Sequence, residues 1–552
     1  MNPALAPLRV RIFRVLWLAG IVSTIGSWMQ TVGAQWLLIE HGSPAAVVAL
    51  VQTAASAPVL LLALPAGVLG EFLNRRTVLI VVQSVQLAVV LVLTGLTIAG
   101  TMTPALLLVL TFLLGACSAV QLPAYQAIVP DIVPRPLISD AAVLSSIGVN
   151  VARAIGPAAA GLLVAQLGVA SVFLANALSF AVFLGALLLW RGYEPPRGRP
   201  ERFLDATRAG LRYIRHAGVI RGLYLRLALF LLPANALWAL LPVVASGTYR
   251  MGAGGYGLLL AALGVGSVAG AFVLPPLRRR LSASAVVSLS AAVFGASMVG
   301  IILLPSLPLV LAVLVVAGIA WIGVIATING TVQSFLPVWV RTRGLSIYQL
   351  VLFGMTAVGA AVSGAIAGPL GVGPVMVGCG VLLVLLAAVG AARPSVSPAG
   401  KGRGIVPLPL TDVPPVLAET ETEDGGAAST SSAASGAARP TGADRDHAPV
   451  LVLVRYTVPD ERRPEFEKRM ALVARTRRRT GARDWSLYAD REDPAVMVEA
   501  FTLGSWQEHV SQHLDRTTEY DAGVLERAKE LAVDDPVAEH LIALPVPSRR
   551  RA

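Results

Sequence analysis

The chain has 552 residues, of which 55% are hydrophobic and 14% are charged, with a formal net charge of +12. Soluble proteins carry about 25% charged residues, so this composition excludes an ordinary soluble protein and indicates a lipid bilayer as the solvent. Most arginines outside the C-terminal region lie in short connections between apolar runs, which membrane topology explains better than nucleic-acid binding. Cys117 and Cys379 lie in apolar runs without metal-ligand spacing, and the sequence predicts no metal site and no cofactor.

Twelve stretches are long and apolar enough to cross a bilayer as helices. The connections between them are mostly short, which predicts that consecutive helices run antiparallel. The predicted spans are 12–39, 45–69, 77–99, 104–123, 141–165, 169–190, 223–246, 254–276, 284–304, 308–332, 345–367 and 373–392.

Arginine alternates between the two sets of loops. One set has the pair Arg75 and Arg76, the basic stretch 191–221 and the run 278–280, whereas the other set offers only Arg250. Positively charged residues stay on the cytoplasmic side of a membrane. This asymmetry predicts that both termini are cytoplasmic and that the membrane is the plasma (inner) membrane.

The basic stretch divides the spans into six and six. Gln126, Pro130, Val133 and Gly161 recur in the second set, at one constant offset, as Gln333, Pro337, Val340 and Gly368. Such a repeat indicates two halves related by an axis along the membrane normal. The predicted organisation is a six-helix half at 1–190, a basic central loop with an interfacial amphipathic helix at 191–222, and a second six-helix half at 223–392.

The remaining residues change character abruptly. Prolines, an acidic run and an Ala/Ser/Gly stretch predict a disordered linker at 393–449, because too few large apolar residues remain to build a core. The last segment, 450–547, returns to alternating and helical patterns in the order of a ferredoxin-like βαββαβ domain. Its predicted elements are a strand at 450–458, a helix at 461–479, a hairpin at 484–489 and 495–502, a helical region at 505–531 and a strand at 537–544.

A loop after the second span reads Pro-Ala-Gly-Val-Leu-Gly-Glu-Phe-Leu-Asn-Arg-Arg from Pro65 to Arg76. It resembles the signature loop of the major facilitator superfamily, although Glu71 replaces the usual aspartate and Phe72 stands where arginine is common. The resemblance implies an all-α polytopic membrane protein of twelve helices, followed here by an α+β domain. It also implies a charge-relay gate at a cytoplasmic end, and the alternative is that the arginines only fix topology. The gate candidates are Gly67, Gly70, Glu71, Arg75, Arg76, Asp131 and Arg135.

A second signature lies in the fourth and fifth spans, from Pro130 to Arg135 and again around Arg153, and ends in a helix-packing motif formed by Gly156, Pro157 and Gly161. With Asn176, it resembles the facilitator branch of enterobactin-exporter-like transmembrane secretion effectors. The resemblance covers most of residues 8–392 and implies export rather than uptake.

Arg153 is the strongest candidate for the substrate path. It lies about 18 Å along its helix at 1.5 Å per residue, near the bilayer centre, where a cation costs a few kcal/mol. It should therefore face a polar cavity, with Asn150 on the same helix face. The alternative is an arginine that locks the bundle by binding carbonyls of a neighbouring helix. Other polar residues of the spans are path candidates or interhelical hydrogen bonds: Gln30, Gln35, Gln52, Asn235, Asn329 and Gln349.

The sequence from Trp506 to His513 resembles the antibiotic-biosynthesis-monooxygenase-like group of dimeric α/β barrels. This resemblance implies a homodimer through the C-terminal domain. It also implies that the residues to consider for catalysis are Trp506, His509, His513 and Tyr520. The alternative is that Trp506 is a core residue and the histidines are surface residues.

Two functions compete on these observations. The first is a secondary active transporter, not an enzyme, that exports a small organic molecule such as a siderophore, drug or secondary metabolite by alternating access, with protons as the coupling ion. The second is a membrane-anchored, cofactor-independent monooxygenase-like enzyme or sensor in which the tail carries the activity. No acid or histidine lies deep in a predicted span, so proton coupling rests on the family resemblance. The absence of a GxxxxGK[ST] loop argues against an ATP-driven pump.

Overall fold

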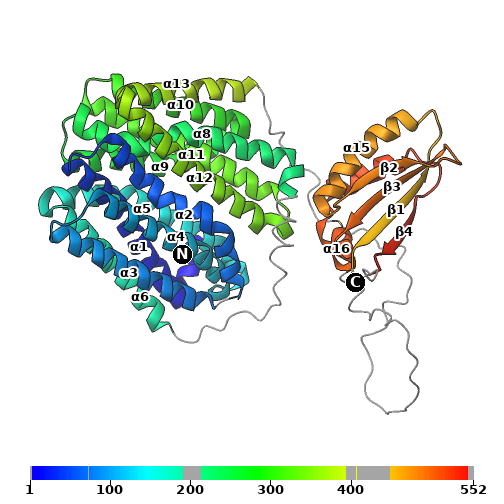
Figure 1. Ribbon diagram of the computed structural model, residues 1–552, viewed down its shortest axis with the longest axis horizontal. Coiled ribbons are helices and arrows are strands. Elements are labelled where there is room, and N and C mark those ends of the chain that lie inside the picture. Colours follow the sequence, from blue (N-terminus) through cyan, green and yellow to red (C-terminus); the bar gives the residue numbers. More distant parts are fainter. Residues whose placement is uncertain (1–2, 73, 191–212, 393–405, 407–447, 545–552) are drawn as a thin grey trace, which may run out of the picture. The chain divides into compact units, whose positions relative to one another are not determined.

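A computed structural model describes residues 3–72, 74–190, 213–392, 406 and 448–544, which form two compact units. One unit is a bundle of long helices and the other is a small sheet covered by helices (Figure 1). The predicted linker, apart from its last residues and Val406, lies outside the described residues, as does most of the predicted central loop.

The described residues contain twelve helices long and apolar enough to cross a membrane, which confirms the number predicted from hydropathy. Their bounds are α1 Arg11–Glu40, α2 Ala45–Phe72, α3 Arg75–Ile98, α4 Pro104–Ile132, α5 Ile138–Leu167, α6 Val169–Leu189, α8 Gly218–Val243, α9 Ala253–Arg280, α10 Ala283–Leu303, α11 Leu307–Phe335, α12 Val338–Leu370 and α13 Val372–Ala392.

Several helices extend further than their apolar runs. α4 continues through Pro123 and Pro130 to Ile132, nine residues beyond the predicted end of its span. Proline interrupts a helix in water, but neighbouring helices can satisfy the freed carbonyls inside a membrane. A five-residue π-helix, Val244–Thr248, extends α8 in the same way. The length of the apolar run therefore underestimates the length of the helix.

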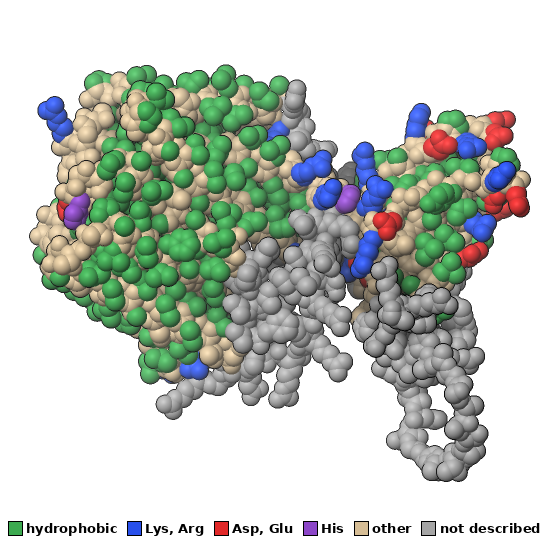
Figure 2. All heavy atoms as spheres, viewed as in Figure 1, with side chains coloured by type: hydrophobic (Ala, Val, Ile, Leu, Met, Phe, Trp, Pro, Cys, Tyr) green, Lys and Arg blue, Asp and Glu red, His purple; other side chains and the backbone are tan. Residues whose placement is uncertain are grey.

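The surface of the bundle has the character expected of lipid contact. Hydrophobic side chains are spread over the face of the bundle shown in Figure 2, and large ones such as Phe272 and Leu189 are 77% and 84% exposed. An exposed apolar surface of this extent is unfavourable in water and favourable in a bilayer. The chain is a multi-pass membrane protein with twelve spans.

Within each half, helices approach closely at glycine. A Cβ added at Gly115 of α4 would lie 2.5 Å from the carbonyl oxygen of Ala55 in α2, and one at Gly295 of α10 would lie 2.5 Å from that of Gly380 in α13. In a membrane, where the hydrophobic effect does not drive helices together, such small residues provide the close packing that holds them.

The two halves meet through α5 and α9. A Cβ at Gly161 of α5 would lie 2.7 Å from the Cα of Gly257 in α9, and one at Gly264 would lie 2.6 Å from the Cα of Ala154. Gly156 and Pro157 take part in the same region, since a Cβ at Gly156 would lie 2.6 Å from Trp28 Cβ and the Pro157 carbonyl lies beside Gly257. The motif predicted for helix packing thus lies where the halves contact each other.

The second unit is a four-stranded antiparallel sheet in the order β2-β3-β1-β4, with a buried core between the sheet and its helices. This βαββαβ order is that of a ferredoxin-like domain. Its elements are β1 Val450–Thr457, α15 Arg463–Thr480, β2 Trp485–Ala489, β3 Val496–Leu503, α16 Trp506–Ser511, α17 Glu519–Lys529 and β4 Val537–Ile542.

The helical region predicted at 505–531 is divided in two. A π-helical turn follows α16, and a new helix begins at Thr518, whose side chain accepts the backbone N–H of Asp521 while the Asp521 carboxylate accepts the N–H of Thr518. This reciprocal capping box fixes a helix start, so α17 is separate from α16 although the apolar spacing runs through both.

Candidate functional site

Arg153 lies near the middle of α5, where the two halves meet. Its Cζ is 5.4 Å from the centre of the Trp28 ring on α1, a cation–π geometry. The next residue, Ala154, lies at the contact with α9, where a Cβ added at Gly264 would be 2.6 Å from its Cα. Asn150, one turn earlier, donates to the carbonyl of Ser146 in its own helix at 2.9 Å.

The guanidinium of Arg153 makes no hydrogen bond to a carbonyl among the described residues, and its Nε is buried without a partner. A buried donor left without an acceptor costs about 1–3 kcal/mol. This geometry disfavours the alternative that Arg153 locks the bundle through carbonyls of a neighbouring helix. It leaves a cationic donor available in the middle of the membrane.

Aromatic side chains surround this position. The Trp28 ring is 5.9 Å from that of Trp238 on α8, which in turn is 5.6 Å from Trp321 on α11. The sequence did not predict these residues as part of a site, because aromatic residues in membrane helices are usually interpreted as packing residues. Their proximity depends on how three separate helices come together.

Asn329 makes a polar contact inside the second half. Its side-chain oxygen accepts a hydrogen bond from Gln333 Nε2 one turn later. Tyr348 of the same half donates its hydroxyl to the Ile325 carbonyl at 3.5 Å.

Gln35 joins the halves nearer the end of α1. Its Nε2 donates to the backbone carbonyl of Trp238 at 3.2 Å, and its Oε1 accepts from the Tyr256 hydroxyl at 2.7 Å. We call the end of the bundle with Glu40 and Ala45 the distal end, and the end with Arg75 and Arg278 the basic end. Gln35 lies about 10 Å closer to the distal end than Trp28 does. Hydrogen bonds and close glycine contacts therefore hold the halves together on the distal side.

The other predicted path residues lie in different surroundings. Gln30 is buried and accepts from Asn176 on α6 at 3.3 Å, inside the first half. Asn235 is buried and donates within its own helix to Leu231. Gln52 and Gln349 are half-buried. Of the predicted path residues, Gln35 therefore makes hydrogen bonds between the halves, whereas Gln30, Asn235 and Asn329 bond inside one half.

Arg75, Arg76 and Asp131, three of the residues predicted for the gate, lie at the basic end and contact neighbouring helices of the first half. Arg75 Nη1 on α3 is 2.7 Å from Asp131 Oδ2 on α4 and donates to the carbonyl of Ala127. Arg76 donates to the carbonyls of Leu187 and Leu188 at the end of α6. These arginines therefore make structural contacts in addition to any role in topology. The side-chain placements at Gly67, Gly70, Glu71 and Arg135 lie outside what the structure describes.

A buried carboxylate organises the C-terminal domain. Glu499 on β3 is fully buried and accepts from Trp485 Nε1 at 2.8 Å, Arg477 Nε at 3.1 Å and the Tyr456 hydroxyl at 3.1 Å. Burial alone would lower the pKa of Arg477, but Glu499 and Tyr456 outweigh burial and the pKa is raised. With its oxygens all engaged, Glu499 is suited to hold the domain together rather than to act as a base.

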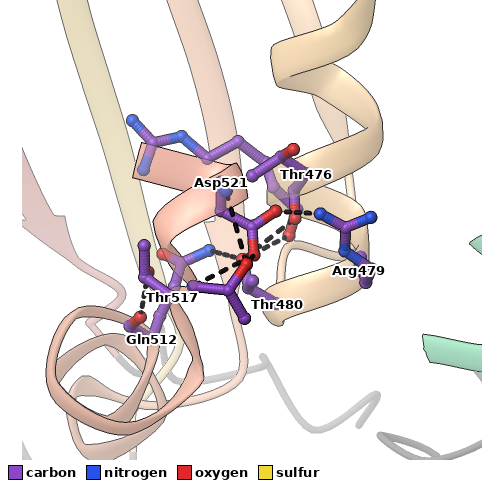
Figure 3. Close-up of polar contacts among 8 residues, drawn as sticks. Thr476, Arg479, Thr480, Gln512, Thr517 and Asp521 are labelled. Atoms are coloured by element: carbon purple, nitrogen blue, oxygen red, sulfur yellow. Dashed lines mark hydrogen bonds and ion pairs between the residues drawn. The ribbon is translucent and has the colours of Figure 1, made fainter. Parts of the chain in front are cut away.

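A second polar cluster connects α15 to α17 (Figure 3). Asp521 pairs with Arg479 and also accepts from the Thr518 hydroxyl, while Gln512 donates to Thr480 at 2.8 Å. Each carboxylate oxygen of Asp521 is therefore used by a cap or an ion pair. This cluster fixes the position of α17 on α15.

The histidines named for catalysis are buried together. His509 and His540 face each other with Nε2 atoms 2.9 Å apart, and the His513 ring lies 4.7 Å from that of His509. Trp506 packs against His509 and His540. Tyr520 is instead exposed, with Arg479 over its ring. Among the described residues, no three metal-ligating side chains are placed to hold an ion.

The twelve membrane-spanning helices have the fold of a secondary transporter of the major facilitator type. The model of the transmembrane secretion effector family matches residues 2–546, which includes the C-terminal domain. The chain belongs to this family, and it is a transporter rather than an enzyme.

Relatives and solved structures agree with this assignment. The chain is 25% identical over 284 residues, half of its length and 70% of the relative's, to the staphyloferrin A transporter of Staphylococcus aureus. It is 24% identical over 385 residues, 67% of its length and 93% of the relative's, to the multidrug efflux pump Tap of Mycolicibacterium fortuitum. A bacterial homologue of the lysosomal transporter Spinster, in an inward-facing, unoccupied conformation, shares the fold with a TM-score of 0.57 at 17% identity, over 71% of this chain and 99% of that one.

Replacement of Gln35 tests the contact between the halves. Gln35→Leu removes the hydrogen bonds to Tyr256 and Trp238, so the distal end should open more often. Spin labels at Ser43 and Gly252, on connections at the distal end, should then report a larger population of long distances. Gln52→Leu is the control, since its side chain has no hydrogen bond among the described residues, and an unchanged distribution in Gln35→Leu would contradict the role given to Gln35.

The buried histidines predict an acid-sensitive C-terminal domain. Burial and nearby positive groups lower the pKa of His509 from 6.5 to about 3 and that of His513 to about 4. The unfolded chain then binds more protons below about pH 6.5. Stability is complete above that pH and falls as the pH decreases toward 4, with a slope of up to about 1.4 kcal/mol per pH unit for each histidine.

Denaturant unfolding of the isolated domain between pH 7 and 4 measures this dependence. His509→Phe should flatten the pH profile, whereas Tyr488→Phe at an exposed position should leave it unchanged. An equally steep profile in His509→Phe would contradict the assignment of a neutral buried histidine.

Proposed function

We propose that this transporter exports a small organic molecule, such as a siderophore, drug or secondary metabolite, across the plasma membrane by alternating access of its two halves. The observation that carries the proposal is Arg153, a half-buried cation whose Nε is buried without a hydrogen-bond partner among the described residues, on the helix through which the halves meet. The names of two relatives, a siderophore transporter and a multidrug efflux pump, support an organic substrate, and the second supports export.

The proposed orientation places both termini and the C-terminal domain in the cytoplasm. The alternation of arginine-rich and arginine-poor loops supports it. The basic end is then cytoplasmic, and the closed distal end faces outward. A substrate reaching Arg153 would come from the cytoplasm, as export requires.

The proposal includes coupling to protons, and this part rests on the family resemblance. The acids of the described helices of the bundle, Glu40, Glu71, Asp131 and Asp140, lie near helix ends, at the limits of α1, α2, α4 and α5. A screen of candidate substrates in inside-out vesicles, with and without an imposed proton gradient, tests direction and coupling together. Accumulation that depends on the gradient supports proton-driven export, and its absence for every substrate that binds contradicts it.

Arg153 should be required for transport. Arg153→Ala removes the cation and should lower the rate of uptake into inside-out vesicles by about tenfold or more, because hydrogen bonds to charged groups are worth about 1.5–3 kcal/mol. Arg153→Lys keeps the charge without the planar guanidinium and should be intermediate. Arg250→Ala, in a connection at the distal end, is the control, and normal rate and substrate range in Arg153→Ala would refute the proposal.

We further propose that the C-terminal domain pairs with the same domain of a second copy. Helices cover one face of its sheet, while the other carries Leu453, Val498 and Leu541, which register places on the same face. Leu541 is 50% exposed, and the same face carries the exposed ion pair of Arg455 with Glu539, so apolar and charged groups are both available for a protein contact. This role in assembly is favoured over a monooxygenase-like or sensory activity of the tail, because the residues named for catalysis do not share one exposed site: His509 is fully buried and Tyr520 is exposed.

The oligomeric state tests this pairing. Leu541→Asp introduces a charge on the uncovered face and should convert a dimer of the full chain to a monomer in light-scattering measurements. Leu472→Asp changes an exposed leucine on the helical side and should leave the dimer intact. A wild-type chain that is monomeric in detergent and in nanodiscs would contradict the pairing.

A further inference from the structure

Both halves supply an unsatisfied hydrogen-bond donor to the central site. Arg153 Nε on α5 and Trp238 Nε1 on α8 are buried and have no partner among the described residues. Both side chains lie against Trp28, whose ring is 5.4 Å from Arg153 Cζ and 5.9 Å from the Trp238 ring. Buried donors are normally paired, so two unpaired donors around one ring indicate a place where a ligand supplies the acceptors.

The site also has a positive charge that no carboxylate neutralises among the described residues. A ligand that carries an anionic oxygen would satisfy the charge of Arg153 and accept hydrogen bonds from both donors. A neutral ligand would leave the charge uncompensated.

Trp238 belongs to a packed aromatic cluster, in which Trp321, Phe230 and Phe294 are buried. Trp238 packs at 5.6 Å against Trp321, with an interplanar angle of 69°, and Trp321 packs at the same distance against Phe230 and Phe294. Trp28 and Trp238 are both only partly buried, so ring surface remains available. Planar rings stack favourably on such faces, whereas an inorganic ion would leave them uncovered.

We infer that the central site takes an organic anion in which a carboxylate is attached to a planar aromatic or conjugated ring, and that Trp238 is a second binding residue supplied by the second half. The inference rests on the proposed function, since it treats the site around Arg153 as the transport site. The backbone carbonyl of Trp238 also accepts the Gln35 hydrogen bond. Contact of the ligand with Trp238 therefore acts on the same residue that holds the distal end closed.

Binding of three matched probes to the full-length protein in lipid nanodiscs tests the substrate class. 2-Naphthoate has the ring and the charge, 2-naphthamide has the ring alone, and cyclohexanecarboxylate has the charge alone. Calorimetric titration should give the tightest binding for 2-naphthoate, with each of the others weaker by about tenfold or more. Equal binding of 2-naphthamide, or of cyclohexanecarboxylate, would overturn the assigned class without any mutation.

The role of Trp238 is tested by Trp238→Phe, which keeps an aromatic ring and removes the N–H. It should weaken 2-naphthoate binding several-fold and leave 2-naphthamide binding nearly unchanged. Trp190→Phe, at the end of α6, should alter neither. Unchanged 2-naphthoate binding in a folded Trp238→Phe would overturn the role of Trp238.

The proposed substrate class and the proposed transport function can be contradicted separately. If 2-naphthoate does not bind but vesicle transport still requires Arg153, the substrate class is wrong and the proposed function stands. If Arg153→Ala transports normally, the proposed function itself fails.

Discussion

The architecture of this protein depends on one constraint, a guanidinium that lies near the middle of a membrane helix and whose Nε has no hydrogen-bond partner among the described residues. Arg153 lies against the Trp28 ring, and its Nε has no acceptor among the described residues. Neither lipid nor an apolar helix face can stabilise such a group, so it requires an internal space that admits polar partners. Two six-helix halves that meet around it supply that space.

The contacts between the halves explain how such a space can open to one side at a time. On the distal side, Gly161 and Gly257 let α5 and α9 touch through their backbones, and Gln35 bonds to Tyr256 and Trp238. These contacts are small and few, and glycine packing can separate without exposing large side chains. At the basic end, the Arg75–Asp131 pair connects helices of one half and so does not oppose the separation of the halves. The distribution of contacts fits rigid-body rocking around a central site.

The sequence predicted the features that depend on local composition. Hydropathy located all twelve helices, and strand alternation around Val450 and Met497 predicted the ferredoxin-like sheet. It missed features that depend on tertiary contact: the continuation of α4 through Pro130, and the break at Thr518 set by a capping box. The position of Arg153 in its helix predicted its depth in the membrane. Its aromatic neighbours could not be predicted, because they come from helices far apart in the chain. Gln30 and Gln35, both buried glutamines of one helix, could not be distinguished before their partners on α6 and α9 were known.

The most direct test of the account is a reversible cross-link across the distal end. An added Cβ at Gly254 of α9 would lie 3.7 Å from the Cβ of Ala165 in α5, within the range of about 3.5–4.5 Å found in disulfides. The variant Ala165→Cys, Gly254→Cys, with Cys117 and Cys379 replaced by serine, should lose transport in inside-out vesicles when oxidised and regain it when reduced. Either single cysteine should transport under both conditions. Undiminished transport by the fully cross-linked protein would contradict alternating access through the separation of α5 and α9.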